Sequence, residues 1–389
     1  MNSGHVTCAS SDVNSQPRAA YIHVPFCAHR CGYCDFTLIA QRDDLVGDYL
    51  RALEREIQEA ALPPNRVLET LYFGGGTPTH PTPDQLNSLF KIVCHSFELS
   101  PNAEFTVEAN PLDLTEEKID LLADAGVNRI SLGVQSFSER ALKLLERDHT
   151  PAQIVDVVTR LRRRIKNISL DLIFGVPDQS LTEWRETLRQ AIDLNPTHIS
   201  AYGLTFETGT AFWTRRERGE LTNCLEEIER DQFAIAMEEL SAAGLAQYEI
   251  SNYATPGFQS RHNHVYWNGD EYWAFGPGAA RYVHGRRETN IRSVLGWLAK
   301  LERDESPVSD AEELEPIHRA REMIYLGLRR NRGVSRQDFF ARTGTELDHL
   351  CGDIIRRQSE LGLLIDDGNS IRLSPTGRFV ADRVLMEFL

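Results

Sequence analysis

The stretch Tyr21-Ile-His-Val-Pro-Phe-Cys27-Ala-His-Arg-Cys31-Gly-Tyr-Cys34 joins a short apolar run to a loop that carries three cysteines. The apolar run has the length and composition of a buried parallel strand. The cysteine loop follows the carboxyl end of this strand directly, and functional residues of parallel α/β folds gather at that end. This stretch therefore predicts an α/β fold with a cysteine site after its first strand.

Five further apolar runs follow, separated by amphipathic stretches. The expected strands span residues 70–73, 105–108, 129–134, 169–174 and 198–203, and the helix candidates span 48–60, 84–97, 115–125 and 181–194. Several helix candidates open with Ser, Thr or Asp and close near Gly or Pro. Because six βα units are too few for a closed eight-stranded barrel, we expect an open, partial (β/α)6 barrel.

The alternation of strands and helices decays after about residue 205, which predicts further segments. A chain of 389 residues exceeds what one compact core usually carries. We expect a disordered N-terminal tail over 1–17, the barrel core over 18–205 and a separate region over 206–314. The segment 315–389 predicts a smaller, mostly helical, winged-helix-like domain that includes the strand-like Ile371-Arg-Leu373.

The overall charge and the hydropathy exclude several classes of protein. A formal net charge of −15 repels a phosphate backbone, so no nucleic-acid partner is expected. The first twenty residues are polar, and no run approaches ~18 uninterrupted apolar residues, so we expect a cytoplasmic protein without a transmembrane segment. Peripheral association with a membrane through a partner protein stays open. Seven cysteines, with three in one short loop, do not suit a secreted disulfide framework.

The three cysteines of the loop predict a site for a soft metal. Thiolates suit iron–sulfur clusters or zinc. A structural zinc ion usually takes four ligands, and only His23 or His29 stands nearby as a fourth. A cluster held by three cysteines instead leaves one iron open to a small molecule. Both alternatives remain at this point.

The C-x3-C-x2-C spacing, with the aromatic Tyr33 before the third cysteine, resembles the radical-SAM superfamily. This resemblance implies a [4Fe–4S] cluster on Cys27, Cys31 and Cys34. It further implies that the amino and carboxylate groups of S-adenosylmethionine (SAM) occupy the open iron.

Several other polar or glycine positions stand at strand ends. Gly74-Gly-Gly-Thr-Pro78 ends the second strand, and glycines let backbone carbonyls approach a ligand. Glu108 ends the third strand, Gln135 the fourth, Asp171 lies in the fifth, and Arg147 lies between the fourth and fifth strands. Buried polar groups need partners, so these residues either pair with one another, as Arg147 with Asp171, or face SAM. The resemblance implies the second, for a set of Tyr21, Tyr33, Phe36, Gly74, Gly75, Gly76, Thr77, Glu108, Gln135, Arg147 and Asp171.

Longer motifs narrow the resemblance to the oxygen-independent coproporphyrinogen III oxidase group. They are Tyr-Ile-His-Val-Pro-Phe-Cys27, Tyr-Phe-Gly-Gly-Gly-Thr-Pro-Thr79, Val-Glu-Ala-Asn-Pro111, Arg-Ile-Ser-Leu-Gly-Val-Gln-Ser-Phe137 and Asp-Leu-Ile-Phe-Gly-Val-Pro177. The group contains true oxidases and heme chaperones. The oxidases carry a further cysteine two residues after the third ligand, where this chain has Phe36, a side chain without a lone pair. This difference argues against oxidase activity.

The segment His262-Asn-His-Val-Tyr-Trp267 resembles the H-N-x-x-Y-W motif of the heme chaperones. The resemblance implies that His262 binds heme iron, with Asn263, Tyr266 and Trp267 beside it. A neutral imidazole is a common axial ligand, and aromatic rings offer apolar surface to a porphyrin. Many relatives have a histidine where Ala280 stands, so the second axial ligand is open between His264 and His284.

We therefore expect a radical-SAM heme chaperone, with a [4Fe–4S] cluster, SAM and heme as its cofactors. The expected partners are a heme-acceptor protein and an electron donor of the flavodoxin or ferredoxin type. One alternative is an oxygen-independent coproporphyrinogen III oxidase of porphyrin biosynthesis. Another is a zinc-stabilised binding module without a redox role.

Overall fold

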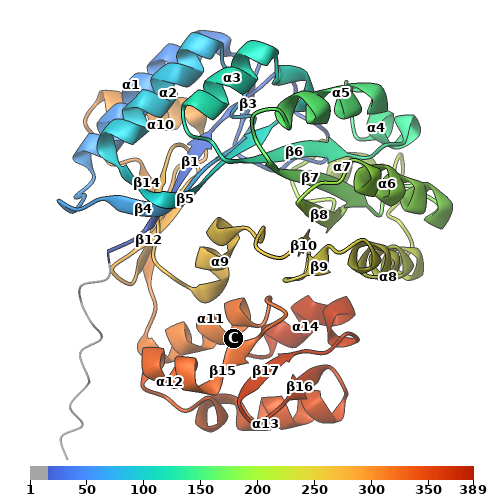
Figure 1. Ribbon diagram of the computed structural model, residues 1–389. Coiled ribbons are helices and arrows are strands. Elements are labelled where there is room, and N and C mark those ends of the chain that lie inside the picture. The colour runs from blue at the N-terminus through green and yellow to red at the C-terminus, as the bar shows by residue number, and fades with distance from the viewer. Residues whose placement is uncertain (1–15) are drawn as a thin grey trace, which may run out of the picture. The chain divides into compact units, whose positions relative to one another are not determined.

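The computed structural model describes residues 16–389, which form two compact units (Figure 1). The larger unit contains residues 18–264 and 271–313, and the smaller contains 314–389 together with 265–270. The tail expected over 1–17 falls outside the described residues, apart from residues 16 and 17.

A nine-stranded sheet forms the framework of the larger unit. Its central strands are β1 (Ala19–Val24), β4 (Val67–Gly75), β5 (Glu98–Ala109), β6 (Arg129–Gln135), β7 (Asn167–Phe174) and β8 (His198–Gly203). All neighbours among these six are parallel. Beyond residue 205 the sheet continues with β9 (Ala246–Gln247) and β10 (Asn252–Ala254), both antiparallel, and with β11 (Trp273–Phe275), parallel to β1. The expected open α/β barrel is confirmed, and three strands extend it.

Amphipathic helices cover the outer side of this sheet (Figure 1). They are α1 (Val46–Glu59), α2 (Pro83–Ser96), α3 (Glu116–Asp124), α4 (Glu139–Leu144), α5 (Pro151–Leu161) and α6 (Leu181–Asp193). Helix α2 illustrates why they form: Thr82 caps its first turn, and Leu86, Leu89, Phe90 and Val93 recur at helical spacing on its buried face. The expected helices lie close to their predicted bounds.

The remaining elements complete the larger unit. They are β2 (Phe26–Cys27), β3 (Ile39–Ala40), α7 (Ala211–Glu217), α8 (Glu226–Ala242), the first half of α9 (Arg261–Asn268), β12 (Ala280–Val283), β13 (Arg286–Asn290), α10 (Val294–Glu302) and β14 (Val308–Glu313). Strands β12, β13 and β14 form a small antiparallel sheet. Residues 261–264 of α9 belong to the larger unit and 265–268 to the smaller.

The smaller unit is mostly helical, as expected. It contains α11 (Pro316–Gly327), β15 (Val334–Ser335), α12 (Arg336–Thr343), α13 (Leu347–Glu360), β16 (Leu364–Asp366), β17 (Ser370–Leu373) and α14 (Ala381–Met386). The strand-like segment at Ile371 lies in β17, at the centre of a three-stranded sheet. The winged-helix likeness stays a prediction. Within residues 16–389, no helix has both the length and the apolar character needed to cross a bilayer.

Candidate cofactor site

The cysteine loop is pinned at its base. Strands β2 and β3 pair in parallel, so Cys27 and Ala40 stand side by side where the loop begins and ends. The backbone N–H of Gln41 donates to Cys27 O at 3.2 Å. Inside the loop, Cys34 N donates to Cys31 O at 3.0 Å. The loop is therefore an ordered scaffold for its three thiols.

The apex of the loop, Gly32, is held by two residues, Glu146 and Phe212. Its N–H donates to the Glu146 carboxylate at 2.9 Å, and its carbonyl accepts from Phe212 N at 2.8 Å. A Cβ on Gly32 would lie 2.4 Å from the Phe212 ring, so a larger residue would require the ring or the loop to shift. The Glu146 carboxylate also lies 3.1 Å from His29 Nε2. Neither Glu146 nor Phe212 was expected from the sequence, because both are far from the loop along the chain.

Arg147, which follows Glu146, points toward the cysteines. Its Nη1 lies 3.8 Å from Cys31 Sγ, and its Nη2 donates to Gly133 O at 3.1 Å. Burial raises the pKa of Cys27 to about 12, and its sulfur lies 3.1 Å from Thr77 Oγ1. A metal that binds there must displace the thiol proton.

The glycines at the end of β4 make close contact with β1 and the cysteine loop. Gly75 has φ +116°, and a Cβ there would lie 2.6 Å from the His23 ring. A Cβ on Gly76 would lie 2.8 Å from Phe26 O. The absent side chains therefore allow the strand end to pack against the base of the loop.

A cavity of about 540 Å³ opens at the carboxyl ends of the strands. The sequence-predicted residues that line it are Cys27, Cys31, Cys34, Tyr33, Phe36, Gly75, Gly76, Thr77, Glu108, Gln135, Arg147, Asp171 and Asn263. Tyr21 and Gly74 lie behind the wall: the Tyr21 ring stacks on Tyr72, which does line the cavity. Phe36 is 59% exposed. The structure thus gathers most of the predicted cluster and SAM residues around one space.

Two carboxylates in the cavity wall are costly to ionise. Burial raises the pKa of Glu108 to about 7, although Tyr72 Oη donates to it at 2.7 Å and Gly75 N at 3.1 Å. Burial also raises the pKa of Asp171, which accepts hydrogen bonds from Ser131, Ser169 and Ser200. Within the described residues, Asp171 and Arg147 do not pair with each other.

The three serines around Asp171 are candidate site residues that our sequence analysis missed. They stand at alternate positions of β6, β7 and β8, between apolar residues such as Ile130, Leu170 and Ala201. Side chains two apart in a strand share one face, so this polar alternation marks the side of the sheet that faces the cavity. The alternation could have identified them.

His262 lies in a different environment, 1% exposed. Its Nδ1 is 2.8 Å from Thr70 Oγ1, and its ring stacks on Tyr72 at 5.0 Å. Burial and the nearby Arg129 lower the pKa of His262 to about 3, so the imidazole is neutral. The next residue, Asn263, lines the cofactor cavity.

The backbone N–H groups of Arg261 and His262 both donate to the Glu104 carboxylate at 3.0 Å, which caps the first turn of α9. Tyr266 and Trp267 lie in the part of α9 that belongs to the smaller unit. There the Arg329 guanidinium lies 4.8 Å above the Trp267 ring. The structure therefore separates the predicted heme residues into a buried histidine, a cavity residue and two aromatics in the other unit.

The cavity suits a bulky group better than a single ion. Among residues 16–389, no group of three or more His, Cys, Asp or Glu side chains has the spacing of a mononuclear metal site. The three cysteines instead share a wall of the large cavity with polar groups that could hydrogen-bond a ligand. This arrangement fits an iron–sulfur cluster with a small molecule beside it.

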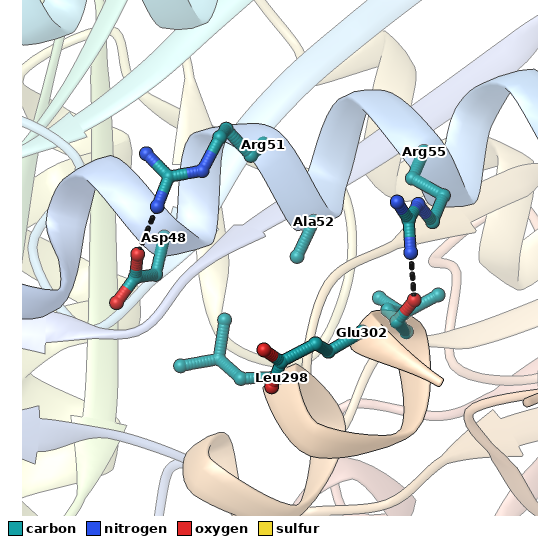
Figure 2. Close-up of a pocket in the computed structure, with 7 residues that line it drawn as sticks. Asp48, Arg51, Ala52, Arg55, Leu298 and Glu302 are labelled. Carbon is teal, nitrogen blue, oxygen red and sulfur yellow. Dashed lines mark hydrogen bonds and ion pairs between the residues drawn. The ribbon is translucent and has the colours of Figure 1, made fainter. Parts of the chain in front are cut away.

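A second hollow, of about 250 Å³, lies between α1 and α10 (Figure 2). Its two arginines are engaged locally: Arg51 pairs with Asp48, and Arg55 donates to the backbone of Leu301. Ala52, Leu298 and Leu301 supply its apolar wall, beside the carboxylate of Glu302. The residues that line this hollow include no cysteine or histidine, so the candidate chemistry lies in the larger cavity.

Comparisons with known proteins identify the family of this chain. The Radical SAM superfamily model matches residues 21–191, and the HemN C-terminal domain model matches 314–380. Heme chaperone HemW of Bacillus subtilis is 36% identical over 375 residues, which cover 96% of this chain and 99% of that protein. Heme chaperone HemW of Escherichia coli is 34% identical over 393 residues, with 97% and 99% coverage.

Among solved structures, coproporphyrinogen III oxidase from Escherichia coli superposes with a TM-score of 0.84 over 96% of this chain and 90% of that one. At 21% sequence identity this likeness shows the fold alone. The sequence relatives, in contrast, are similar over nearly their whole length. The chain therefore belongs to the HemW heme chaperone family of the radical SAM superfamily.

Proposed function

We propose that this protein is a heme chaperone, which binds heme and passes it to an acceptor protein. Family membership supports this function, since the curated relatives named heme chaperones match this chain over 96–97% of its length. The observation that carries it is the cavity, in which three cysteines face the polar side chains predicted for SAM and Asn263 of the heme motif.

In this proposal Cys27, Cys31 and Cys34 hold a [4Fe–4S] cluster, and SAM occupies the cavity beside it. The cluster and SAM together supply one-electron chemistry. The protein's own groups position the ligand: Glu108 and Asp171 offer acceptors to hydroxyl groups, and the Arg147 guanidinium offers positive charge to a carboxylate. The clamp on Gly32 holds the thiols in place.

His262 is the proposed heme ligand, with Tyr266 and Trp267 as apolar surface for the porphyrin. An axial ligand needs an accessible nitrogen lone pair, and the His262 ring is buried against Thr70 and Tyr72. Heme ligation by His262 therefore requires the first turn of α9 to move.

The proposal includes two protein partners. An acceptor receives heme, and an electron donor of the flavodoxin or ferredoxin type reduces the cluster. We further propose that the protein works in the cytoplasm, as the sequence analysis predicts. These partners and this location follow from the proposed function rather than from particular contacts.

An anaerobic heme titration tests the proposal. Purified protein with a reconstituted cluster is titrated with heme, and the Soret spectrum and the iron and sulfide contents are measured. We expect a saturable Soret change in the wild type and an altered or absent one in His262→Ala. His95→Ala removes an exposed histidine of α2 and serves as the control.

Identical spectra for the wild type and His262→Ala would eliminate His262 as the ligand, and no heme binding at all would overturn the function. The same preparation discriminates the alternatives. Loss of propionate groups from coproporphyrinogen III, with SAM and a reductant, would favour the oxidase despite Phe36. Bound zinc in place of iron and sulfide would favour the zinc-stabilised module.

A further inference from the structure

A chain of buried hydrogen bonds leads from the cofactor cavity to the start of α9. Asp171 Oδ1, in the cavity wall, is 3.2 Å from Ser169 Oγ. Ser169 Oγ is 2.8 Å from His198 Nδ1, and His198 Nε2 is 2.9 Å from Tyr248 Oη. The N–H of Ser260, the residue before α9, donates to Tyr248 Oη at 3.2 Å. Ser169, His198, Tyr248 and Ser260 are all buried.

The hydrogen bonds of this chain have one consistent direction. Tyr248 Oη accepts from Ser260, so its own hydrogen is available to donate to His198 Nε2. Burial lowers the pKa of His198 well below its ordinary value, so the ring is neutral. Because Nε2 then accepts from Tyr248 Oη, the one ring hydrogen lies on Nδ1. Nδ1 then donates to Ser169 Oγ, which donates to Asp171. The opposite tautomer would leave the Tyr248 hydroxyl hydrogen without this acceptor and remove the Ser169 donor from Asp171.

The same turn of α9 reaches the cavity directly. Asn263 lines the cavity, and its N–H donates to Ser260 Oγ at 3.2 Å. Asp171 and the first turn of α9 are therefore joined twice, by the cavity wall and by the hydrogen-bond chain. His262, the proposed heme ligand, lies in this turn.

We propose that His198 and Tyr248 are positioning residues that couple occupancy of the cofactor cavity to the first turn of α9, so that SAM and heme bind antagonistically. This inference rests on the proposed function, because it concerns heme binding through His262. SAM carries a net positive charge, and a cation in the cavity favours the ionised form of Asp171. A charged acceptor strengthens the hydrogen bonds that point toward it, and linked bonds reinforce one another.

The first turn of α9 is then held more firmly when SAM is bound. Heme ligation needs this turn to move, because His262 is buried. SAM must therefore weaken heme binding. By thermodynamic reciprocity, heme weakens SAM binding by the same factor.

The test measures heme affinity with and without SAM, on protein with a reconstituted cluster and without reductant, so that SAM stays intact. We expect heme to bind wild-type protein about fivefold or more weakly when SAM saturates the cavity. Tyr248→Phe keeps the ring and removes only the hydroxyl, so its ratio of heme affinities should approach one. Ser169→Ala breaks the chain at another bond and should give the same result if Tyr248→Phe folds poorly.

Thr187→Val is the matched control. It removes a buried hydroxyl that contacts Ser136 and takes no part in the hydrogen-bond chain from Asp171 to Ser260. This variant should keep the wild-type ratio. The inference would be overturned if SAM left the heme affinity of the wild type unchanged or increased it. It would also be overturned if Tyr248→Phe and Ser169→Ala both kept the wild-type ratio of heme affinities. Complete absence of heme binding in the wild type would instead overturn the proposed function itself.

Discussion

The cysteine cavity and the buried histidine of α9 differ in how far their side chains are already arranged to bind a ligand. In the cavity, loop and strand ends are fixed by contacts such as Gly32 to Glu146, while Glu108 and Asp171 face an open volume. His262, in contrast, already packs against Thr70 and Tyr72. The cavity already presents its thiols and carboxyl groups to an open volume, whereas the histidine must first leave its present contacts.

The largest expected effect is loss of the cluster in Cys34→Ala. Two remaining thiolates cannot hold three irons of a [4Fe–4S] cluster, so iron and sulfide should fall from about four each per chain to near zero. Heme binding should persist, because the proposed ligand His262 lies in α9 and not in the cysteine loop. Chemical quantitation after anaerobic reconstitution measures the first result and a Soret titration the second, with Cys94→Ala on α2 as control. Loss of heme binding along with the cluster would show that the two regions are one site.

The next largest effect is reduced cluster assembly when the contacts that hold the cysteine loop at Gly32 are disturbed. Gly32→Ala places a Cβ 2.4 Å from the Phe212 ring, which must shift or push the cysteine loop away. Overpacking of this kind costs about 1–3 kcal/mol, and we expect iron incorporation to fall several-fold. Gly47→Ala, in helix α1, would place a Cβ at an ordinary contact distance of 3.6 Å from the Arg51 side chain and should leave the iron content unchanged. Normal iron content in Gly32→Ala would show that the clamp does not prepare the site.

The same two regions explain what the sequence could and could not reveal. Six strands follow from apolar runs, and the cysteine loop lies within eight residues, so both are visible locally. Glu108 and Asp171 stand at strand ends, which parallel strands bring to one edge. These predictions needed no long-range information beyond the order of the strands.

The burial of His262 depends on distant residues. Its partner Thr70 is 192 positions away, and Glu104, which caps α9, is 158 positions from His262. The motif at residues 262–267 predicted a heme ligand from its residue types. Contacts with residues so far away along the sequence leave no periodic pattern in it, so the burial of His262 could not be predicted. Gly32 is a similar case, because its clamp comes from Glu146 and Phe212.

A smaller effect, on the pH dependence of stability, comes from the burial of the Glu108 carboxyl group in the cavity wall. The pKa of Glu108 is about 7 in the folded protein, against an ordinary 4.5, because burial disfavours its charge. Between pH 4.5 and 7 the folded state keeps a proton that the unfolded state releases, so stability falls as pH rises through this range and then levels off. The expected contribution is on the order of 1–3 kcal/mol, reduced where water in the cavity screens the charge.

Urea unfolding of the cluster-free protein at several pH values tests this effect. Glu108→Gln cannot ionise, so the difference in unfolding free energy between wild type and variant should change between pH 5 and pH 8. The exposed Glu54→Gln on α1 should show no such change. A pH-independent difference for Glu108→Gln would mean that the carboxyl group is well solvated and the cavity carries no such cost.

The smallest expected effect is a change in heme affinity in Thr70→Val, which tests whether His262 must move to bind heme. Thr70→Val keeps the shape of the side chain and removes the hydroxyl 2.8 Å from His262 Nδ1. Losing one buried hydrogen bond of about 1 kcal/mol makes it easier for the imidazole to leave, so heme affinity should rise a few-fold in a Soret titration. If the hydroxyl instead orients the ring for iron, as partners of metal-bound histidines commonly do, heme affinity should fall. A rise would support a concealed ligand, whereas a fall would place His262 in a prepared site and remove the difference between the two regions.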